Sequence, residues 1–419
     1  MKENKAHMTK GQDRAMEAFC SGKNVFLSGE AGTGKSFVLN QFLQKLPPDS
    51  STLVCAPTGI AAINIHGTTM HRAFGIPIRP LGPDEAPEYL SKELLAAKRI
   101  IIDEISMARF DVFQYAARCI LEAERKSGIH KQIIVVGDFY QLPPVITEKD
   151  REILCQIWNV EDIGDGFAFQ APHWMTFNFA NVILNEQVRQ RDDADFVQHL
   201  NAIRCGDKKA LGWFNCHAAT TIQAGISLCP TNREAAAINV AAASKLCGDW
   251  TVFRSICLGK VTPSDKPTDD ILRLKPGMQI MALVNDREGR YQNGSIGVIV
   301  NITKGKINAR FENGNTAVIR PYAWDILEPE LNDEGVVIMK AIGQFIQLPI
   351  RVAYAITIHK SQGQTFSNAN LTPACFATGQ LYVAISRMTN ISGLYLTSEI
   401  KPKYLKTSQI VRDFYCSAA

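Results

Sequence analysis

The sequence predicts an α/β protein that contains a doubly wound parallel sheet. Short apolar runs at residues 24–27, 52–58, 99–102 and 132–138 read as buried strands, and the stretches between them space their apolar residues as helices do. Strands that alternate with helices are typical of parallel sheets covered on both faces. The chain has 419 residues, of which 46% are hydrophobic. That is enough for about two to four domains with hydrophobic cores.

The strongest local signal follows the first of these runs. Residues 29–36 read Gly-Glu-Ala-Gly-Thr-Gly-Lys-Ser and fill every fixed position of the phosphate-binding pattern G-x-x-x-x-G-K-[ST]. A strand precedes this loop and a helical stretch follows it, so backbone N–H groups and a helix N-terminus converge on the phosphates of a nucleoside triphosphate. We expect Lys35 to reach the outer phosphates and Ser36 to bind Mg²⁺. The alternative is an ordinary glycine-rich turn, and both flanks argue against it.

Two carboxylates end the third apolar run. Residues 99–104 read Arg-Ile-Ile-Ile-Asp-Glu, and ligands of parallel sheets bind at the carboxyl ends of the strands. We therefore expect Asp103 to hold Mg²⁺ and Glu104 to orient and deprotonate the attacking water. The alternative is an acidic pair at the start of a helix, where such pairs are common.

A polar amide lies just beyond the fourth run. Residues 137–145 read Gly-Asp-Phe-Tyr-Gln-Leu-Pro-Pro-Val, which places Gln141 close to a strand end of the same sheet. In that position Gln141 can sense the γ-phosphate of the nucleotide. Taken alone, the segment fits a turn made by glycine and two prolines equally well.

Composition narrows the class of protein further. No run is long enough to span a bilayer, and the first residues resemble neither a secretory signal nor an Arg-rich transit helix, so a cytoplasmic protein is expected. The 11 cysteines include no C-x-x-C pair, which indicates reduced thiols rather than zinc or disulfides. The net charge of +4 permits a polyanionic partner without requiring one.

Further motifs follow in a fixed order and carry a family resemblance. They are Leu-Asn-Glu-Gln-Val-Arg-Gln at 184–190, Thr-Ile-His-Lys-Ser-Gln-Gly at 357–363 and Leu-Tyr-Val-Ala-Ile-Ser-Arg at 381–387, together with residues 56–62, 67–71 and 137–145. The series resembles the motifs of superfamily 1 helicases, in the RecD-like 5′-to-3′ group that contains the Pif (petite integration frequency) family. The resemblance covers about residues 9–395.

The resemblance implies a domain plan. Two RecA-like P-loop NTPase lobes, each a parallel sheet flanked by helices, would hold ATP between them. The first lobe is expected at residues 1–175, with a small wedge insertion at about 64–80 in which Phe74 or Ile76 either meets the last base pair or packs as in any short loop. The remaining segments are 176–295 and 351–419 for the second lobe and 296–350 for an inserted SH3-like β-barrel.

It also implies roles at the nucleotide. Arg189 and Arg387 would reach from the second lobe and stabilise charge on the transferred phosphoryl group, although an arginine at either position could instead be a solvated surface residue. The catalytic set is then Lys35, Glu104, Gln141, Arg189 and Arg387. The nucleotide-binding set is Gln12, which resembles the adenine-reading glutamine of the family, with Gly32, Thr33, Gly34, Lys35, Ser36 and Gly363.

Single-strand contacts rest on the family pattern alone, because nonspecific binding uses scattered phosphate contacts and stacking. The implied residues are Thr58, Thr69, His71, Thr231, Asn232, His359, Ser361 and Gln362. Each has a structural alternative: His71 could be a satisfied buried histidine, and Thr231 could cap the helix that follows it.

The expected activity is that of an ATP- and Mg²⁺-dependent helicase that moves 5′ to 3′ on single-stranded DNA in replication, repair or recombination. Its expected partners are single strands and single-strand/duplex junctions, with G-quadruplexes and RNA–DNA hybrids as further candidates, and the expected form is a monomer at the nucleoid of a bacterial or phage-infected cell. The alternatives are the motor subunit of a larger recombination or nuclease complex, and a slow nucleotide-gated switch that binds nucleic acid.

Overall fold

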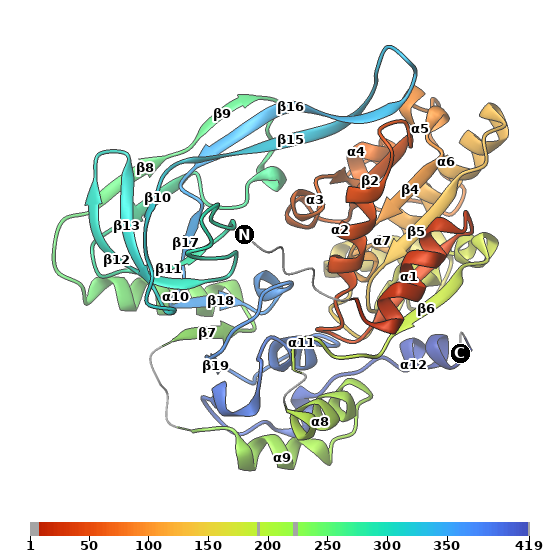
Figure 1. Cartoon of the computed structure of the whole chain (residues 1–419). Helices are drawn as coiled ribbons and strands as arrows, with labels where there is room; N and C mark the ends of the chain where they lie inside the picture. Colours follow the sequence, from red (N-terminus) through yellow and green to blue (C-terminus); the bar gives the residue numbers. More distant parts are fainter. Residues whose placement is uncertain (1–7, 191–192, 221–224, 418–419) are drawn as a thin grey trace. The chain divides into compact units, whose positions relative to one another are not determined.

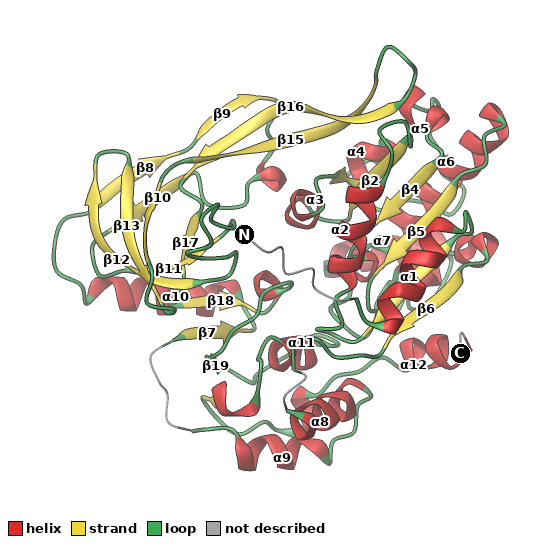
Figure 2. Cartoon of the chain, viewed as in Figure 1, coloured by secondary structure: helices red, strands yellow, loops and turns green. Residues whose placement is uncertain are grey.

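The computed structural model describes residues 8–190, 193–220 and 225–417 (Figure 1). Contacts divide the chain into two compact units. The first unit contains Met1–Arg189, Leu327–Ala341 and Ser408–Ala419, and the second contains Gln190–Ile326 and Ile342–Thr407. Each unit has its own parallel sheet flanked by helices, so the predicted α/β class is confirmed (Figure 2).

The sheet of the first unit has six strands in the order β3-β2-β4-β5-β1-β6, and all its pairings are parallel. Strands β1, β2 and β5 are buried along their whole length, which explains why they read as continuous apolar runs. The strands are β1 (Val25–Gly29), β2 (Thr52–Ala56), β3 (Thr68–Thr69), β4 (Arg99–Ile102), β5 (Gln132–Val136) and β6 (Ala180–Leu184).

Helices cover both faces of this sheet. Alternate strand residues belong to two cores: Val25, Leu27 and Ile101 pack with α1, α2 and α3, while Phe26 and Ile100 pack with α4, α5 and α6. This alternation is what a doubly wound sheet requires. The helices of the first unit are α1 (Lys10–Cys20), α2 (Lys35–Lys45), α3 (Gly59–Asn64), α4 (Met70–Phe74), α5 (Lys92–Ala96), α6 (Phe110–Ser127), α7 (Glu148–Trp158) and α12 (Gln409–Ser417).

The first unit includes more of the chain than the expected lobe of residues 1–175. Strand β6 pairs with β1 along its whole length and therefore extends the same sheet. The tip of the hairpin formed by β15 (Tyr322–Leu331) and β16 (Val337–Gln347) also packs there, with Val337 in the core and its N–H donating to Ser51 Oγ at 3.3 Å. Helix α12 was expected in the second lobe, but its aromatic side chains contact the first unit.

The second unit has a four-stranded parallel sheet in the order β18-β7-β19-β20. Its strands are β7 (Ile226–Cys229), β18 (Ala355–Thr357), β19 (Ala369–Leu371) and β20 (Leu394–Leu396), and its helices are α8 (Ala194–Arg204), α9 (Ala210–His217), α10 (Asn232–Ser244) and α11 (Gln380–Ser386). Together with the first unit, this sheet bears out the expectation of two RecA-like lobes.

Antiparallel strands make up the rest of the second unit. The strands expected near 297–300, 306–311 and 316–320 form as β12 (Ile296–Thr303), β13 (Lys306–Phe311) and β14 (Thr316–Ile319), in a sheet ordered β14-β13-β12-β11-β17. The other strands are β8 (Thr251–Arg254), β9 (Ile256–Gly259), β10 (Ile271–Leu274), β11 (Gln279–Ala282) and β17 (Ile350–Val352). Strands β8 to β11 precede residue 296, so the antiparallel region begins earlier than the expected insertion at 296–350. That this insertion is an SH3-like barrel stays a prediction. Among the residues described, no helix is long and apolar enough to cross a membrane.

Candidate nucleotide and nucleic-acid site

Three neighbouring strands of the first unit end at the same edge of the sheet. Strand β4 lies beside β5, and β5 lies beside β1, all in parallel. Their carboxyl ends open into Asp103 and Glu104, into the loop of Gln141 and into the phosphate-binding loop. This edge of an open α/β sheet is where ligands bind. The structure therefore brings together the three motifs that the sequence singled out.

The phosphate-binding loop turns through two left-handed glycines. Gly32 has φ 89° and Gly34 has φ 85°, values that few other residues adopt. Lys35 begins α2, and its Nζ donates to the carbonyl oxygens of Gly29 at 2.9 Å and Glu30 at 3.0 Å. The ammonium group thus lies across the loop, next to the backbone that would surround a phosphate.

Gln12 holds this loop from α1. Its Oε1 accepts from Thr9 N at 3.0 Å in a capping box, and its Nε2 donates to Thr33 O at 3.0 Å. A Cβ at Gly34 would lie 2.6 Å from Gln12 Nε2, so only glycine fits there without movement. Both ends of the Gln12 amide are engaged in fixing the loop, and its role in reading adenine stays a prediction.

The two acids follow β4 in a constrained turn. Asp103 is buried, and its Oδ1 accepts from Glu104 N at 2.9 Å. Glu104 has φ 50°, an uncommon conformation for a residue with a side chain and one that recurs at functional sites. A Cβ at Gly137 would lie 2.9 Å from Ile105 Cγ2, so glycine at the end of β5 leaves room for this turn.

Burial makes Asp103 a poor place for an isolated negative charge. Burial first, and then the neighbouring Glu104 charge, raise the pKa of Asp103 to about 7, while Lys35 opposes the shift. A divalent cation would supply the missing positive charge. Carboxylate and hydroxyl oxygens, here those of Asp103 and Ser36, are the ligands that Mg²⁺ prefers beside phosphates. The residues present therefore fit the metal.

Asp138, a residue that the sequence interpretation did not single out, holds Gln141. Gln141 is buried, and its Nε2 donates to Asp138 Oδ2 at 3.4 Å. Asp138 Oδ1 accepts from Tyr140 N at 3.1 Å, and Asp138 O accepts from Gln141 N at 2.9 Å. The signal that could have found Asp138 is its place directly after the strand-ending Gly137.

Arg189 was expected on the second lobe, but the structure places it in the first unit. Strand β6 carries the chain along β1 to the phosphate-binding loop, where Val188 N and Arg189 N donate to Gly32 O at 3.1 and 3.2 Å. Gln187 Nε2 also donates to Glu30 Oε2, at 2.7 Å. The chain leaves the first unit only after Arg189.

Arg387 does belong to the second unit, at the end of α11. It is buried, and its guanidinium donates to Val383 O at 3.0 Å and Ser386 Oγ at 2.9 Å. Gln190, which sequence reasoning missed, donates from Nε2 to Ser386 O at 3.0 Å and Met388 O at 2.8 Å. The residue that follows Arg189 in the chain therefore holds the backbone on both sides of Arg387.

The predicted single-strand residues of the first unit include two helix caps. Thr58 Oγ1 accepts from Ala61 N, and Thr69 Oγ1 accepts from Arg72 N, both at 3.3 Å. A hydroxyl that accepts one such bond keeps its own hydrogen for a phosphate oxygen. His71 is half-buried, and burial followed by the charge of Arg109 lowers its pKa, which favours the neutral ring at pH 7.

The predicted residues of the second unit meet at one sheet edge. Strands β7 and β18 are parallel neighbours, so Thr231 and Asn232 after β7 lie beside residues 359–362 after β18. Thr231 is exposed and caps α10 by accepting from Glu234 N at 3.2 Å. The Nε2 of Gln362 is buried with no hydrogen-bond partner among the described residues, as expected of a group that awaits a ligand.

Three residues of the segment 359–363, which follows β18, differ in their burial and in their available hydrogen-bonding groups. Ser361 is fully buried and donates its hydroxyl to Ile358 O at 2.7 Å, so in this conformation it supports the turn rather than a strand. Burial lowers the pKa of His359, which favours the neutral ring. Gly363 is exposed, with φ 76°.

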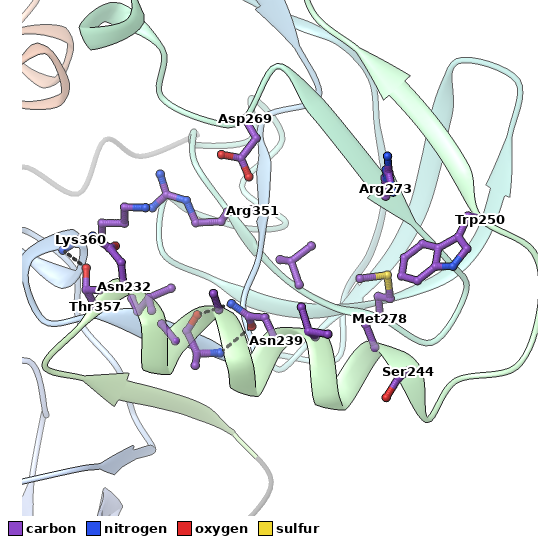
Figure 3. Close-up of a pocket in the computed structure, with 17 residues that line it drawn as sticks. Asn232, Asn239, Ser244, Trp250, Asp269, Arg273, Met278, Arg351, Thr357 and Lys360 are labelled. Atoms are coloured by element: carbon purple, nitrogen blue, oxygen red, sulfur yellow. Dashed lines mark hydrogen bonds between the residues drawn. The ribbon is translucent and has the colours of Figure 1, made fainter.

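A cavity of about 760 Å³ continues from Asn232 along α10 (Figure 3). Small residues of α10 form one wall, where Asn239 is fixed by two hydrogen bonds to the backbone of Ala355, at 2.8 and 2.9 Å. Trp250 lies at the far end, 49% exposed, with Lys275 Nζ 4.4 Å from the centre of its ring. The charged residues of the lining are Arg273, Arg351 and Lys360, opposed by Asp269.

The expected wedge region is mostly packed. Phe74 and Ile76 are each 4% exposed and lie in the core of the first unit, so neither can meet a base pair in this conformation. The exposed apolar residue of the segment is Ile78, at 94%. Prolines at 77 and 80 flank it, and the adjacent Arg79 forms two hydrogen bonds to Glu85, at 2.9 and 2.6 Å.

Comparisons with known proteins show the family of the chain. A family model described as PIF1-like helicase matches residues 4–211. The ATP-dependent DNA helicase Pif1 of Bdellovibrio bacteriovorus is 31% identical over 96% of this chain and 90% of its own length. The chain belongs to the PIF1-like helicase family. The PIF1 protein of Danio rerio is 33% identical over 97% of the chain, which spans only 63% of that relative.

Solved structures of PIF1-like helicases match the fold. The crystal structure of Bacteroides sp Pif1 in complex with ADP-AlF4 has a TM-score of 0.87 at 30% identity, covering 98% of this chain and 97% of that one. A structure of Bacteroides Pif1 in complex with ADP-AlF3 and ssDNA has a TM-score of 0.69 at 31% identity, with the same coverage. The resemblance to the Pif family is thus confirmed.

The buried acid leads to a prediction about stability. Because the pKa of Asp103 rises on folding, the folded state loses stability as pH rises from the unfolded value of 3.8 towards 7. Asp103→Asn removes that cost while keeping the acceptor for Glu104 N. In protein free of metal and nucleotide, we expect the variant to unfold at a higher temperature than wild type. This difference in unfolding temperature should be about 2–4 °C larger at pH 8 than at pH 5. Thermal unfolding measures this gain.

The matched control is Asp49→Asn, since Asp49 is exposed. Its effect on the unfolding temperature should be the same at both pH values. An equal gain for Asp103→Asn at pH 5 and pH 8 would contradict the assigned burial of charge.

Proposed function

We propose that this chain is an ATP-dependent DNA helicase that moves 5′ to 3′ on single-stranded DNA and displaces the complementary strand. The observation that carries the proposal is the convergence of the phosphate-binding loop, Asp103, Glu104 and Gln141 at one edge of the first sheet. Membership of the family supports the direction, and the Bacteroides complexes with a nucleotide analogue and ssDNA support the two ligands.

Each residue of the first unit has a step in this proposal. Lys35 binds the outer phosphates in place of its present carbonyl partners, and Glu104 takes the proton of the attacking water. Ser36 and Asp103 would hold Mg²⁺, which would supply positive charge to the phosphates when bound. Gln141 contacts the γ-phosphate. Arg189, already next to Gly32, adds charge as the phosphoryl group departs.

Single-stranded DNA is bound by hydroxyl and amide donors and by the basic cavity beside α10. The free O–H groups of Thr58, Thr69 and Thr231 donate to phosphate oxygens, as does the amide of Gln362. The cavity that begins at Asn232 adds to the contacts of the second unit, because its cationic lining suits a polyanion and its tryptophan suits a base.

The proposal extends to the range of substrates. It includes single-strand/duplex junctions, G-quadruplexes, RNA–DNA hybrids and action as a monomer. Unwinding rates on matched substrates of each kind, with sedimentation of the protein alone and on DNA, test these points separately.

Lys35→Ala tests the motor. Loss of the phosphate-binding cation should lower ATP turnover by at least about 100-fold while leaving weak binding to single strands. The matched control is Lys45→Ala, which removes an exposed lysine from the last turn of the same helix. Hydrolysis with and without single-stranded DNA is the measurement, followed by unwinding of 5′- and 3′-tailed duplexes. Wild-type protein that no nucleic acid stimulates would exclude a motor.

Ile78→Ala tests strand separation. An exposed apolar tip held between two prolines is suited to stack against the last base pair, and shortening it should slow unwinding about 5- to 10-fold without changing DNA-stimulated ATP turnover. Met175→Ala is the control, since Met175 is a similarly exposed apolar residue of the first unit, at 79%. Unchanged unwinding by Ile78→Ala would remove this residue from the wedge.

Trp250→Ala tests the groove of the second unit. Loss of base stacking should weaken binding to single strands about 5- to 100-fold, whereas Trp250→Phe should keep most of the affinity. Fluorescence anisotropy with labelled oligonucleotides measures both. An affinity equal to wild type in a variant with an unchanged unfolding temperature would place the strand elsewhere.

A further inference from the structure

The last described helix, α12, crosses back to the first unit. Residues up to Thr407 belong to the second unit, and residues from Ser408 to the first. Phe414 anchors the helix by stacking on Phe169, with ring centres 4.3 Å apart, and by edge contacts with Phe139 at 5.5 Å. The helix therefore packs against the core of the first unit that contains Phe139.

The next residue, Tyr415, bridges two strands of that site. Its hydroxyl is 2.6 Å from Ser28 Oγ and accepts from Phe139 N at 3.2 Å. Ser28 directly precedes the first glycine of the phosphate-binding loop, and Phe139 lies in the loop between Asp138 and Gln141. One hydroxyl thus joins the entry of one motif to the middle of the other.

The bridge made by Tyr415 continues the link between β5 and β1 beyond the ends of these strands. The backbone bond from Gly137 N to Leu27 O, at 3.0 Å, links β5 to β1. Ser28 follows Leu27 by one residue and Phe139 follows Gly137 by two, and here the Tyr415 hydroxyl connects the two segments. Its ring also stacks on Tyr140, with centres 5.0 Å apart and planes 11° apart, which fixes the hydroxyl in direction.

We infer that Tyr415 is a positioning residue for ATP hydrolysis, which holds the Gln141 loop at a set distance from the phosphate-binding loop. This inference rests on the proposed function. Gln141 reaches a γ-phosphate only if its loop keeps its place relative to the loop that binds that phosphate, and small misplacements at such a site reduce the rate strongly. In this role Tyr415 acts through Ser28 and Phe139.

The segment before α12 connects this bridge to the arginine helix. Lys406 O accepts from the N–H of Gly379, the residue that caps α11, at 3.0 Å. Helix α11 leads to Arg387. The stretch 406–415 therefore runs from a residue bonded to the helix of Arg387 in the second unit to the residue bonded to the loop of Gln141 in the first.

Tyr415→Phe is the test, because it removes the hydroxyl and keeps the stacked ring. With the full chain, kcat of DNA-stimulated ATP hydrolysis should fall about tenfold, while KM for ATP and the affinity for single strands stay within about twofold. Tyr404→Phe is the matched control: Tyr404 lies just before α12, with its ring against Lys403, and this variant should keep kcat.

A double-mutant cycle distinguishes positioning from simple stability. If Tyr415 acts through Gln141, adding Tyr415→Phe to Gln141→Ala should lower kcat by less than about twofold more. A full tenfold loss in the Gln141→Ala background overturns the inference. So does an unchanged kcat in Tyr415→Phe, or a loss of kcat that disappears when the assay is run equally far below the unfolding temperature of each protein. Wild-type protein without DNA-stimulated turnover would instead contradict the proposed function itself.

Discussion

Parallel pairing of β4, β5 and β1 is the constraint on which the nucleotide site depends. The register pairs Ile102 with Val135 and Leu27 with Val136, so the residues after each strand emerge at one level. Because side chains alternate between the faces of a sheet, a shift of one residue would turn Asp103 to the opposite face. The two cores on either side of the sheet oppose such a shift, since it would exchange their apolar residues. Packing far from the phosphates thus sets the geometry at the phosphates.

The same site is costly for the fold. Glu104 adopts a left-handed backbone, and Asp103 is held where a negative charge is poorly solvated. Gly137 leaves space for this turn, and Gly34 leaves space for the amide of Gln12. A ligand that brings positive charge to the acids and binds only the folded state stabilises that state, which offsets part of this cost.

Sequence reasoning found the parts of the site that are local in the chain. A strand, a glycine-rich loop and a helix follow one another within residues 24–45, so the loop of Lys35 could be read directly. The assignment of Arg189 to the first unit could not be read from the sequence. It depends on the pairing of β6 with β1, which brings together residues about 155 positions apart in the chain. Tyr415 is harder still, because an aromatic residue near the end of a chain carries no motif. The exposure of Ile78 could not be read either, because the apolar pattern of Phe74, Ile76 and Ile78 does not reveal which of them pack inward.

The boundary between the two units lies between Arg189 and Gln190. Arg189 N is bound to the carbonyl of Gly32, whereas the side chain of the next residue, Gln190, is bound on both sides of Arg387. One peptide bond therefore separates a residue fixed to the phosphate-binding loop from a residue fixed to the turn of the second arginine. Gly32 is therefore linked to that turn through a hydrogen bond to Arg189, one peptide bond and the two hydrogen bonds of Gln190. This proximity gives a physical reason for Arg189 and Gln190 to occupy one motif.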